Sequence, residues 1–103
     1  MYTIQGVLFK LELGARLAYT TAIRIFGKSD HALVTLLVSI PVAERILEFL
    51  AGGEASIQVQ VDSYTVEIVR KSDIVSLSVN SSVPVKEAEF SVAEFKQLVE
   101  RIL

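Results

Sequence analysis

Aromatic and basic residues are interleaved along two stretches near the start of the chain, FKLELGAR and AIRIFGK. Aromatic rings can stack on unpaired bases, and lysine and arginine can contact phosphates, which is how sequence-tolerant binders of single strands work. The stretches therefore predict contacts with single-stranded nucleic acid. The seven candidate residues are Phe9, Lys10, Arg16, Tyr19, Arg24, Phe26 and Lys28.

Residue types that suggest catalysis are also present, but their spacing argues against it. Ser29, Asp30 and His31 are the three types of a hydrolytic triad, yet a triad needs separate elements to converge in space. The similar residues 72–74 lack the histidine, so turn preferences explain both stretches. One histidine and no cysteine argue against a zinc site. We therefore expect no enzyme, no metal and no cofactor.

Composition limits the class of protein. The chain has 103 residues, 51% of them apolar, which suits a single domain, residues 1–103, and excludes a disordered tail. Charged residues interrupt the apolar runs, so we expect no membrane span. No basic region precedes an apolar stretch at the start, so we expect no signal peptide either. The absence of cysteine suits a cytoplasmic protein. The net charge of −2 argues against a protein that coats duplex DNA by charge alone, so any nucleic-acid role must rest on a local patch.

An internal match predicts a duplicated unit. Residues 24–44 and 67–87 align without a gap, and Lys-Ser-Asp and Ser-x-Pro-Val-x-Glu recur in one register. Val-Ala-Glu at 42–44 also matches 92–94, at a longer offset, just ahead of a helical pattern. We expect two units, at about 3–51 and 56–103, with extra residues before the second helix.

Hydrophobic period and turn residues predict the elements that position the candidate residues. In the first unit, strands at 3–13 and 16–26 flank Gly14-Ala15, which is typical of a hairpin loop. A third strand at 31–39 precedes a helix at 41–50, which begins with a proline and is stopped by two glycines.

The second unit has a clearer pattern of strands and turns. Strands are expected at 56–61, 64–69 and 74–80, joined by turns at 62–63 and 71–73. Both units give an α+β fold, βββα followed by ββββα, in which antiparallel sheets pack against two helices.

The last boundary has two possible interpretations. Pro84 could open a helix of some twenty residues, as Pro41 opens the first. Against this, Ser91 can cap a helix, with Glu94 closing a capping box and Phe90 stapled to Phe95. We favour a strand near 83–90 and a helix from 91.

The faces of the predicted strands differ between the units. In the second unit one face is apolar and the other polar. In the first hairpin, a loop at Gly14-Ala15 puts Lys10 opposite Tyr19 and leaves apolar residues on both faces. One face would carry Ile4, Leu8, Leu17, Ile23 and Ile25, and the other Val7, Phe9, Leu11, Leu13, Ala18, Ala22 and Phe26.

Apolar residues on both faces of residues 3–40 predict self-association, as a homodimer or homotetramer. The same pattern supports a different function. The phenylalanines can pack at a protein interface with the arginines on its rim, in a structural or adaptor protein that has no catalytic activity.

The chain resembles known single-strand binders. The stretch IQVQVDSYTVEIVRKSDIVSLSV leading to FSVAEFKQLVERIL is similar to the strands-then-helix units of Whirly and PUR-type proteins. The small size, the aromatic sheet near FKLELGAR and AIRIFGK, and a composition that suits a thermophile resemble the archaeal ThermoDBP-related proteins. This resemblance implies an oligomer that holds single-stranded DNA on aromatic and basic residues with little sequence preference.

Overall fold

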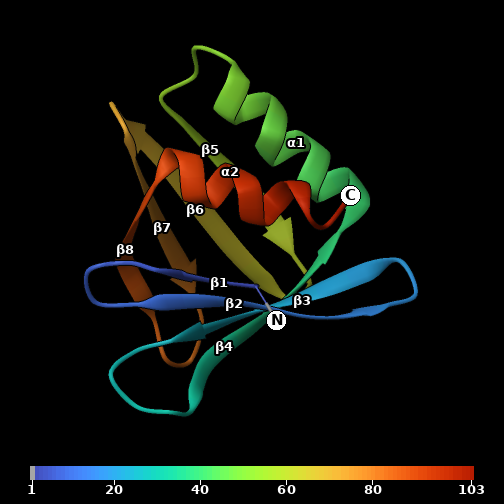
Figure 1. The fold of residues 1–103 in the computed structure, drawn as a ribbon, viewed down its shortest axis with the longest axis vertical. Helices are drawn as coiled ribbons and strands as arrows, with labels where there is room; N and C mark the ends of the chain where they lie inside the picture. The colour runs from blue at the N-terminus through green and yellow to red at the C-terminus, as the bar shows by residue number, and fades with distance from the viewer. Residues whose placement is uncertain (1) are drawn as a thin grey trace.

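The computed structural model describes residues 2–103, and two units of four strands and one helix follow each other along the chain (Figure 1). The elements of the first unit are β1 (Tyr2–Gln5), β2 (Lys10–Leu17), β3 (Thr20–Phe26), β4 (Ala32–Ser39) and α1 (Ile40–Ala51). Those of the second are β5 (Ser56–Val61), β6 (Tyr64–Lys71), β7 (Ile74–Asn80), β8 (Val85–Ser91) and α2 (Val92–Glu100). Each set of four strands forms one antiparallel sheet in chain order. The α+β fold class and the strands-then-helix units are confirmed.

The first unit has four strands where three were expected, because a turn splits the predicted strand at 3–13. The backbone N–H of Gly6 donates to the carbonyl of Phe9, 2.8 Å away, and closes this turn. The turn also lies against β8, where a Cβ on Gly6 would approach the carbonyl oxygen of Glu89 to 2.4 Å. Glycine is needed here for close approach.

The predicted hairpin loop at Gly14-Ala15 is wrong. The chain reverses at Ala18 and Tyr19, with Ala18 at a φ of 52°, and residues 14–15 lie in a β-bulge inside β2. Lys10 is therefore opposite Phe26 rather than Tyr19.

The new register also corrects the faces. Leu11 lies opposite Ile25, and Leu13 opposite Ile23, so the two leucines face the core although they were expected on the other side. Leu8 and Leu17, which were expected on the same face as Ile23 and Ile25, are exposed, Leu8 in the turn before β2 and Leu17 at the end of β2. Only β4 keeps the predicted apolar character on both sides.

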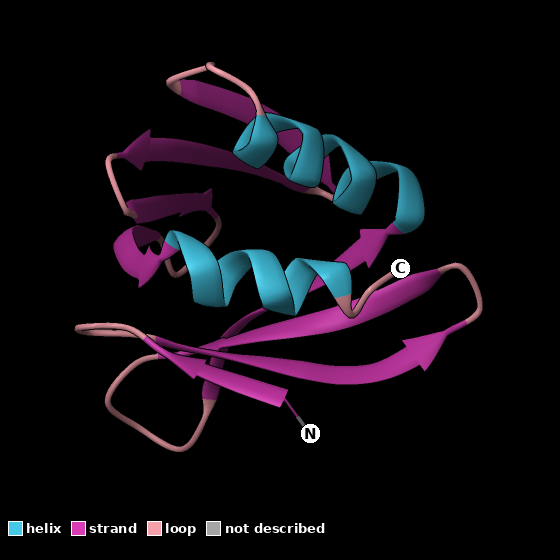
Figure 2. Ribbon diagram, turned by 45° about the horizontal axis from the view of Figure 1, so that its top comes forward, coloured by secondary structure: helices cyan, strands magenta, loops and turns pink. Residues whose placement is uncertain are grey.

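Both helices lie on one side of the first sheet and fill the wedge between it and the second sheet (Figure 2). Apolar residues of both sheets and both helices form one core. At its centre is a small enclosed cavity of about 30 Å³, lined by residues such as Ile23, Leu36, Ile46, Ile68 and Phe95. The two units therefore share their core rather than each having its own. Within residues 2–103 no helix is both long and apolar enough to cross a membrane.

The helix boundaries follow the expected signals. The hydroxyl of Ser91 accepts a hydrogen bond from the backbone N–H of Glu94 at 3.1 Å, so Ser91 caps α2 as predicted, and a helix from Pro84 is excluded. At the other helix, Arg70 donates to the carbonyl of Leu50 near the end of α1. Each helix is thus fixed at one end by a side chain.

A surface ion pair ties α1 to the loop that follows it. Arg45 donates to both carboxylate oxygens of Glu54, at 3.1 and 3.0 Å. This hydrogen bonding lowers the pKa of the Glu54 carboxyl and raises the pKa of Arg45. The pair is exposed, so it orders the loop more than it stabilises the fold.

The internal match proves to be out of phase by one strand. The first Lys-Ser-Asp lies in the loop between β3 and β4, but the second lies at the turn between β6 and β7. By position in the unit, β4 corresponds to β8 rather than β7. The Val-Ala-Glu match does join the first turns of the two helices. The duplicated architecture is real, whereas the alignment at the shorter offset pairs strands that are not equivalent.

Candidate nucleic-acid interface

The outer side of the first sheet is not covered by either helix (Figure 2). We call this side the open face. Its position follows from the register, because residues opposite each other on antiparallel strands share a face. The open face carries Thr3, Gln5, Lys10, Glu12, Ala22, Arg24, Phe26, Thr35 and Leu37.

Lys10 and Phe26 form a cation–π pair on the open face. They are directly opposite on β2 and β3, and the ammonium of Lys10 lies over the ring of Phe26, 4.7 Å from its centroid. The ring is half-buried. A nucleobase could stack on its accessible part while the ammonium contacts the adjoining phosphate.

Arg24 and Glu12 form the next cross-strand pair. The Nη1 atom of Arg24 lies 3.1 Å from a carboxylate oxygen of Glu12, and their side chains are 45% and 17% exposed. An ion pair this accessible contributes about 0–1 kcal/mol, so a phosphate can compete with the carboxylate for Arg24. Sequence reasoning missed Glu12 at the site because its partner depends on the strand register.

The other candidate residues are separated from this group. Phe9 packs against the core, and Arg16 lies opposite Thr21, on the side of the hairpin that carries the core residues. Tyr19 is exposed at the hairpin tip. Lys28 is exposed in the loop that follows Phe26. The structure thus brings together Lys10, Arg24 and Phe26, with Lys28 following closely in the chain.

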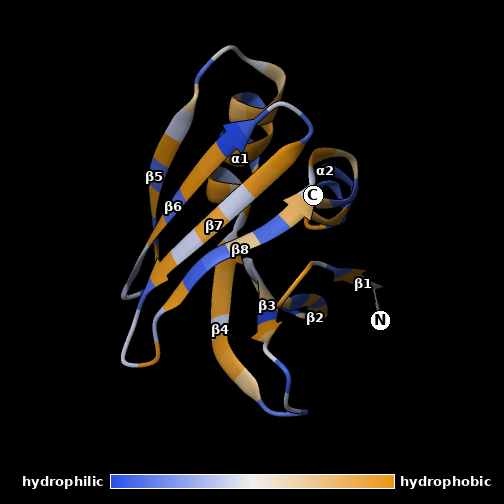
Figure 3. Cartoon of the chain, turned by 90° about the vertical axis from the view of Figure 1, so that its left-hand side faces the viewer, coloured by the Kyte–Doolittle hydropathy of each residue, from blue (hydrophilic) through white to orange (hydrophobic). Residues whose placement is uncertain are grey.

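The two sheets differ in charge. Residues 2–39 contain four basic and two acidic side chains, whereas residues 56–91 contain three basic and five acidic ones. The strands of the second sheet alternate between polar and apolar residues (Figure 3), as expected for a sheet with one solvated face. A polyanion is therefore attracted to the first sheet more than to the second.

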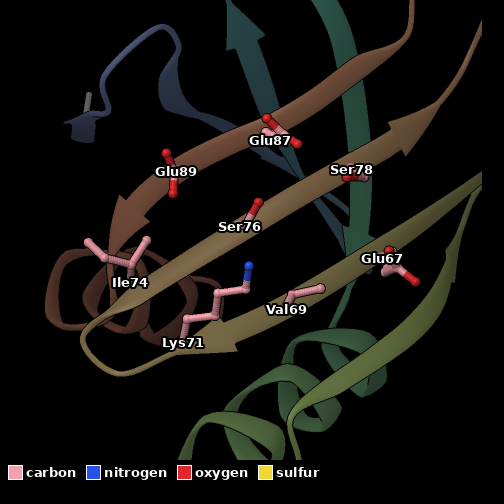
Figure 4. A pocket seen from close by; sticks show the side chains of 8 residues that line it. All are labelled: Glu67, Val69, Lys71, Ile74, Ser76, Ser78, Glu87 and Glu89. Carbon is pink, nitrogen blue, oxygen red and sulfur yellow. The ribbon is translucent and has the colours of Figure 1, made fainter.

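The outer face of the second sheet forms a shallow hollow of about 470 Å³ (Figure 4). Glu67, Glu87 and Glu89 line it, and Lys71 is the one basic residue among the lining side chains. Three carboxylates repel phosphate groups. This hollow is a poor site for nucleic acid.

A second hollow, of about 780 Å³, lies at the edge of the first sheet where β1 stops and β2 continues. We call it the basic notch; its lining residues are Tyr2, Leu13, Gly14, Ala15, Arg24 and Arg101. The guanidinium carbon of Arg101 lies 4.1 Å from the centroid of the Tyr2 ring. Sequence reasoning missed both residues, since they are at opposite ends of the chain and no spacing links them.

Residues considered for catalysis lie in ordinary positions. The hydroxyl of Ser29 accepts a hydrogen bond from the backbone N–H of His31 at 3.4 Å, which confirms the expected turn chemistry. Within residues 2–103 no group of three or more histidine, aspartate or glutamate side chains is placed to hold a metal ion.

The open face and the basic notch are continuous, because Arg24 belongs to both. No family model matches the chain, and no curated protein or solved structure matches it either. Its function must therefore be inferred from its own residues and their geometry.

Proposed function

We propose that the chain binds single-stranded nucleic acid, in particular DNA, on the open face and with little sequence preference. The observation that carries this proposal is the pairing of Phe26 with Lys10, at 4.7 Å, on a sheet face that no helix covers. Bases would stack on Phe26, and phosphates would contact Lys10, Arg24 and Lys28. The resemblance to ThermoDBP-related, Whirly and PUR-type proteins points the same way, and the absence of cysteine supports a cytoplasmic location.

The weak sequence preference follows from the kind of groups available. Stacking and phosphate contacts do not distinguish between bases, since every base has a π-face and every nucleotide a phosphate. Salt should weaken binding, because each phosphate contact releases counterions from the strand.

Replacing Phe26 with leucine should weaken binding of labelled oligothymidine by about 1–3 kcal/mol for each base that the ring supports. Leucine keeps apolar bulk at a half-buried position, so the fold should be retained, which thermal unfolding can verify. Fluorescence anisotropy, titrated with salt, measures the affinity.

In the same assay Lys10→Gln should lower the salt slope, which is the slope of log affinity against log salt concentration, by roughly 0.7.

Lys71→Gln is the matched control, because it removes the same charge from the outer face of the second sheet. It should leave the salt slope unchanged. If Lys10→Gln and Lys71→Gln lower the salt slope equally, binding depends on the overall charge of the protein and not on the open face. If Phe26→Leu leaves affinity intact, the ring is not a stacking platform.

A second candidate function is assembly with other proteins, and β4 favours it. This strand is an edge of the first sheet, contains no charged residue, and has half-buried Leu33 and Leu37 beside its buried core residues. Exposed apolar edges are frequent sites of association. We therefore also propose a homodimer or homotetramer formed through the first sheet, with an adaptor role as the alternative to nucleic-acid binding.

Sedimentation at micromolar concentration should show an oligomer that Leu37→Lys converts to a monomer, because a buried lysine at the interface would be unpaired. Thr3→Lys, at the opposite edge of the sheet, is the control and should leave the oligomer intact. A wild-type chain that sediments as a monomer would rule out self-association.

A further inference from the structure

We infer that the basic notch binds the terminal phosphate of the strand whose bases lie on the open face. The inference deepens the proposed function and rests on it for the identity of the strand. Its ligand is a phosphate monoester, which carries about −1.5 to −2 charge near neutral pH, more than an internal phosphodiester does. Among the described residues, two guanidinium groups line the notch, from Arg24 on β3 and Arg101 after α2, and no carboxylate does.

Arg101 is held in place by its neighbours. Its guanidinium stacks on the ring of Tyr2, and the hydroxyl of Tyr2 donates to the side-chain oxygen of Gln97 at 2.9 Å. Stacking uses the flat face of the guanidinium and leaves its in-plane N–H donors available, in the geometry that suits two oxygens of one phosphate. Among the described residues, no carboxylate forms a salt bridge with Arg101.

Arg24 approaches the same space from the open face. A Cβ at Gly14 would lie 4.0 Å from the guanidinium carbon of Arg24, which places this guanidinium beside the bulge that lines the notch. Arg24 is bound to Glu12 through Nη1 alone, at 3.1 Å. Its remaining donors can contact an anion.

Backbone groups can add donors. The bulge at Gly14-Ala15 leaves a residue outside the β2–β3 ladder. On the other edge, the β1 ladder stops at Leu13, so no described strand pairs with residues 14–17 on that side. Backbone N–H groups of Gly14 and Ala15, which line the notch beside the two guanidiniums, would favour an oxyanion there.

The location of the notch explains why it would take an end of the strand. It lies at the edge of the first sheet, where the described β1–β2 ladder ends at Tyr2 and Leu13, and it shares Arg24 with the open face. A strand that crosses the open face can place its last phosphate there, whereas an internal phosphate has to pass through the notch with nucleotides on both sides.

The phosphate site can be tested without any oligonucleotide. Thymidine 5′-monophosphate should shift the backbone amide NMR signals of Gly14 and Ala15, and thymidine should not. Arg101→Gln should abolish the shifts. Arg45→Gln should leave them unchanged, because Arg45 lies on α1 and is bound to Glu54 in the following loop. Equal shifts from thymidine, or shifts that survive Arg101→Gln, would overturn the site.

The strand-end ligand is tested with three oligothymidines of equal length, carrying a 5′-phosphate, a 3′-phosphate or neither. One phosphorylated form should bind about tenfold or more tightly than the unmodified strand, as expected for hydrogen bonds to a charged group. Arg101→Gln should remove this preference and leave the affinity for the unmodified strand unchanged.

The possible failures are distinguishable. If unmodified oligothymidine binds but no phosphorylated end is preferred, the proposed function stands and the strand-end inference is wrong. If thymidine 5′-monophosphate binds while no oligothymidine does, the phosphate site stands, but both the proposed function and the strand-end ligand are wrong.

Discussion

Replacing Phe95 with alanine is expected to lower the free energy of unfolding by about 3–5 kcal/mol. Phe95 on α2 is 3% exposed and lines the central cavity together with residues of both sheets and α1, such as Ile23, Ile46 and Ile68. Removing the ring enlarges a void that already exists and cannot collapse from one side, because two sheets and two helices meet there. The total free energy of unfolding of a protein domain is about 5–15 kcal/mol, so the variant should be close to unfolding at moderate temperature.

Equilibrium unfolding in urea measures this loss. Lys96→Ala is the matched control, since it changes the next residue of the same helix at an exposed position and keeps helix propensity high. It should change stability by less than about 0.5 kcal/mol. A loss below about 1 kcal/mol for Phe95→Ala would mean that α2 is not part of the common core.

Replacing Gly6 with alanine is expected to destabilise the protein by about 1–3 kcal/mol, by crowding rather than by a void. The added Cβ would lie 2.4 Å from the carbonyl oxygen of Glu89 and 2.8 Å from a ring carbon of Phe90. A backbone oxygen cannot move like the end of a flexible side chain, so the turn between β1 and β2 must separate from β8. The loss should therefore come with weaker amide protection in both segments.

Gly53→Ala provides the comparison, because a Cβ at Gly53 meets nothing within 4 Å. The same chemical change at this site should be neutral, or stabilising by about 0.4–1 kcal/mol through the unfolded chain. Equal effects at the two glycines would show that the contact between the first turn and β8 is not made.

The second unit could be predicted from its sequence almost residue by residue. Its turns are short, at Asp62-Ser63 and Ser72-Asp73, and its strands alternate apolar and polar residues, so a shift by one residue would have turned polar side chains into the core. A two-residue turn at Asp62-Ser63 requires Val61 opposite Tyr64, Val59 opposite Val66 and Ile57 opposite Ile68, and the strands pair in this register.

The first unit could not be predicted to the same detail. The hairpin turns at Ala18, and alanine gives no sign that it adopts a positive φ, whereas Gly14-Ala15 has the typical appearance of a turn but lies in a bulge. The split at Gly6 depends on β8, a strand far along the chain. Local sequence carries no trace of either constraint.

The same distinction applies to the candidate site. Lys10, Arg24 and Phe26 were recognisable by residue type, because basic and aromatic residues are visible without a structure. The pairing of Lys10 with Phe26, and the carboxylate of Glu12 beside Arg24, needed the correct register. The basic notch needed the whole fold, since Tyr2 and Arg101 meet only when β1 and α2 are neighbours.

The contact between β1 and α2 has a consequence for how the chain folds during synthesis. Tyr2 in β1 emerges from the ribosome before the other seven strands, whereas Gln97 and Arg101, which contact it, emerge only after all eight. Contacts between such distant residues form slowly, because the chain between them must first be ordered. Until α2 arrives, the apolar inner faces of both sheets lack part of their cover, and the uncharged β4 is open to neighbouring nascent chains. Protection by chaperones therefore matters most in the interval after β8 has emerged and before α2 covers the core.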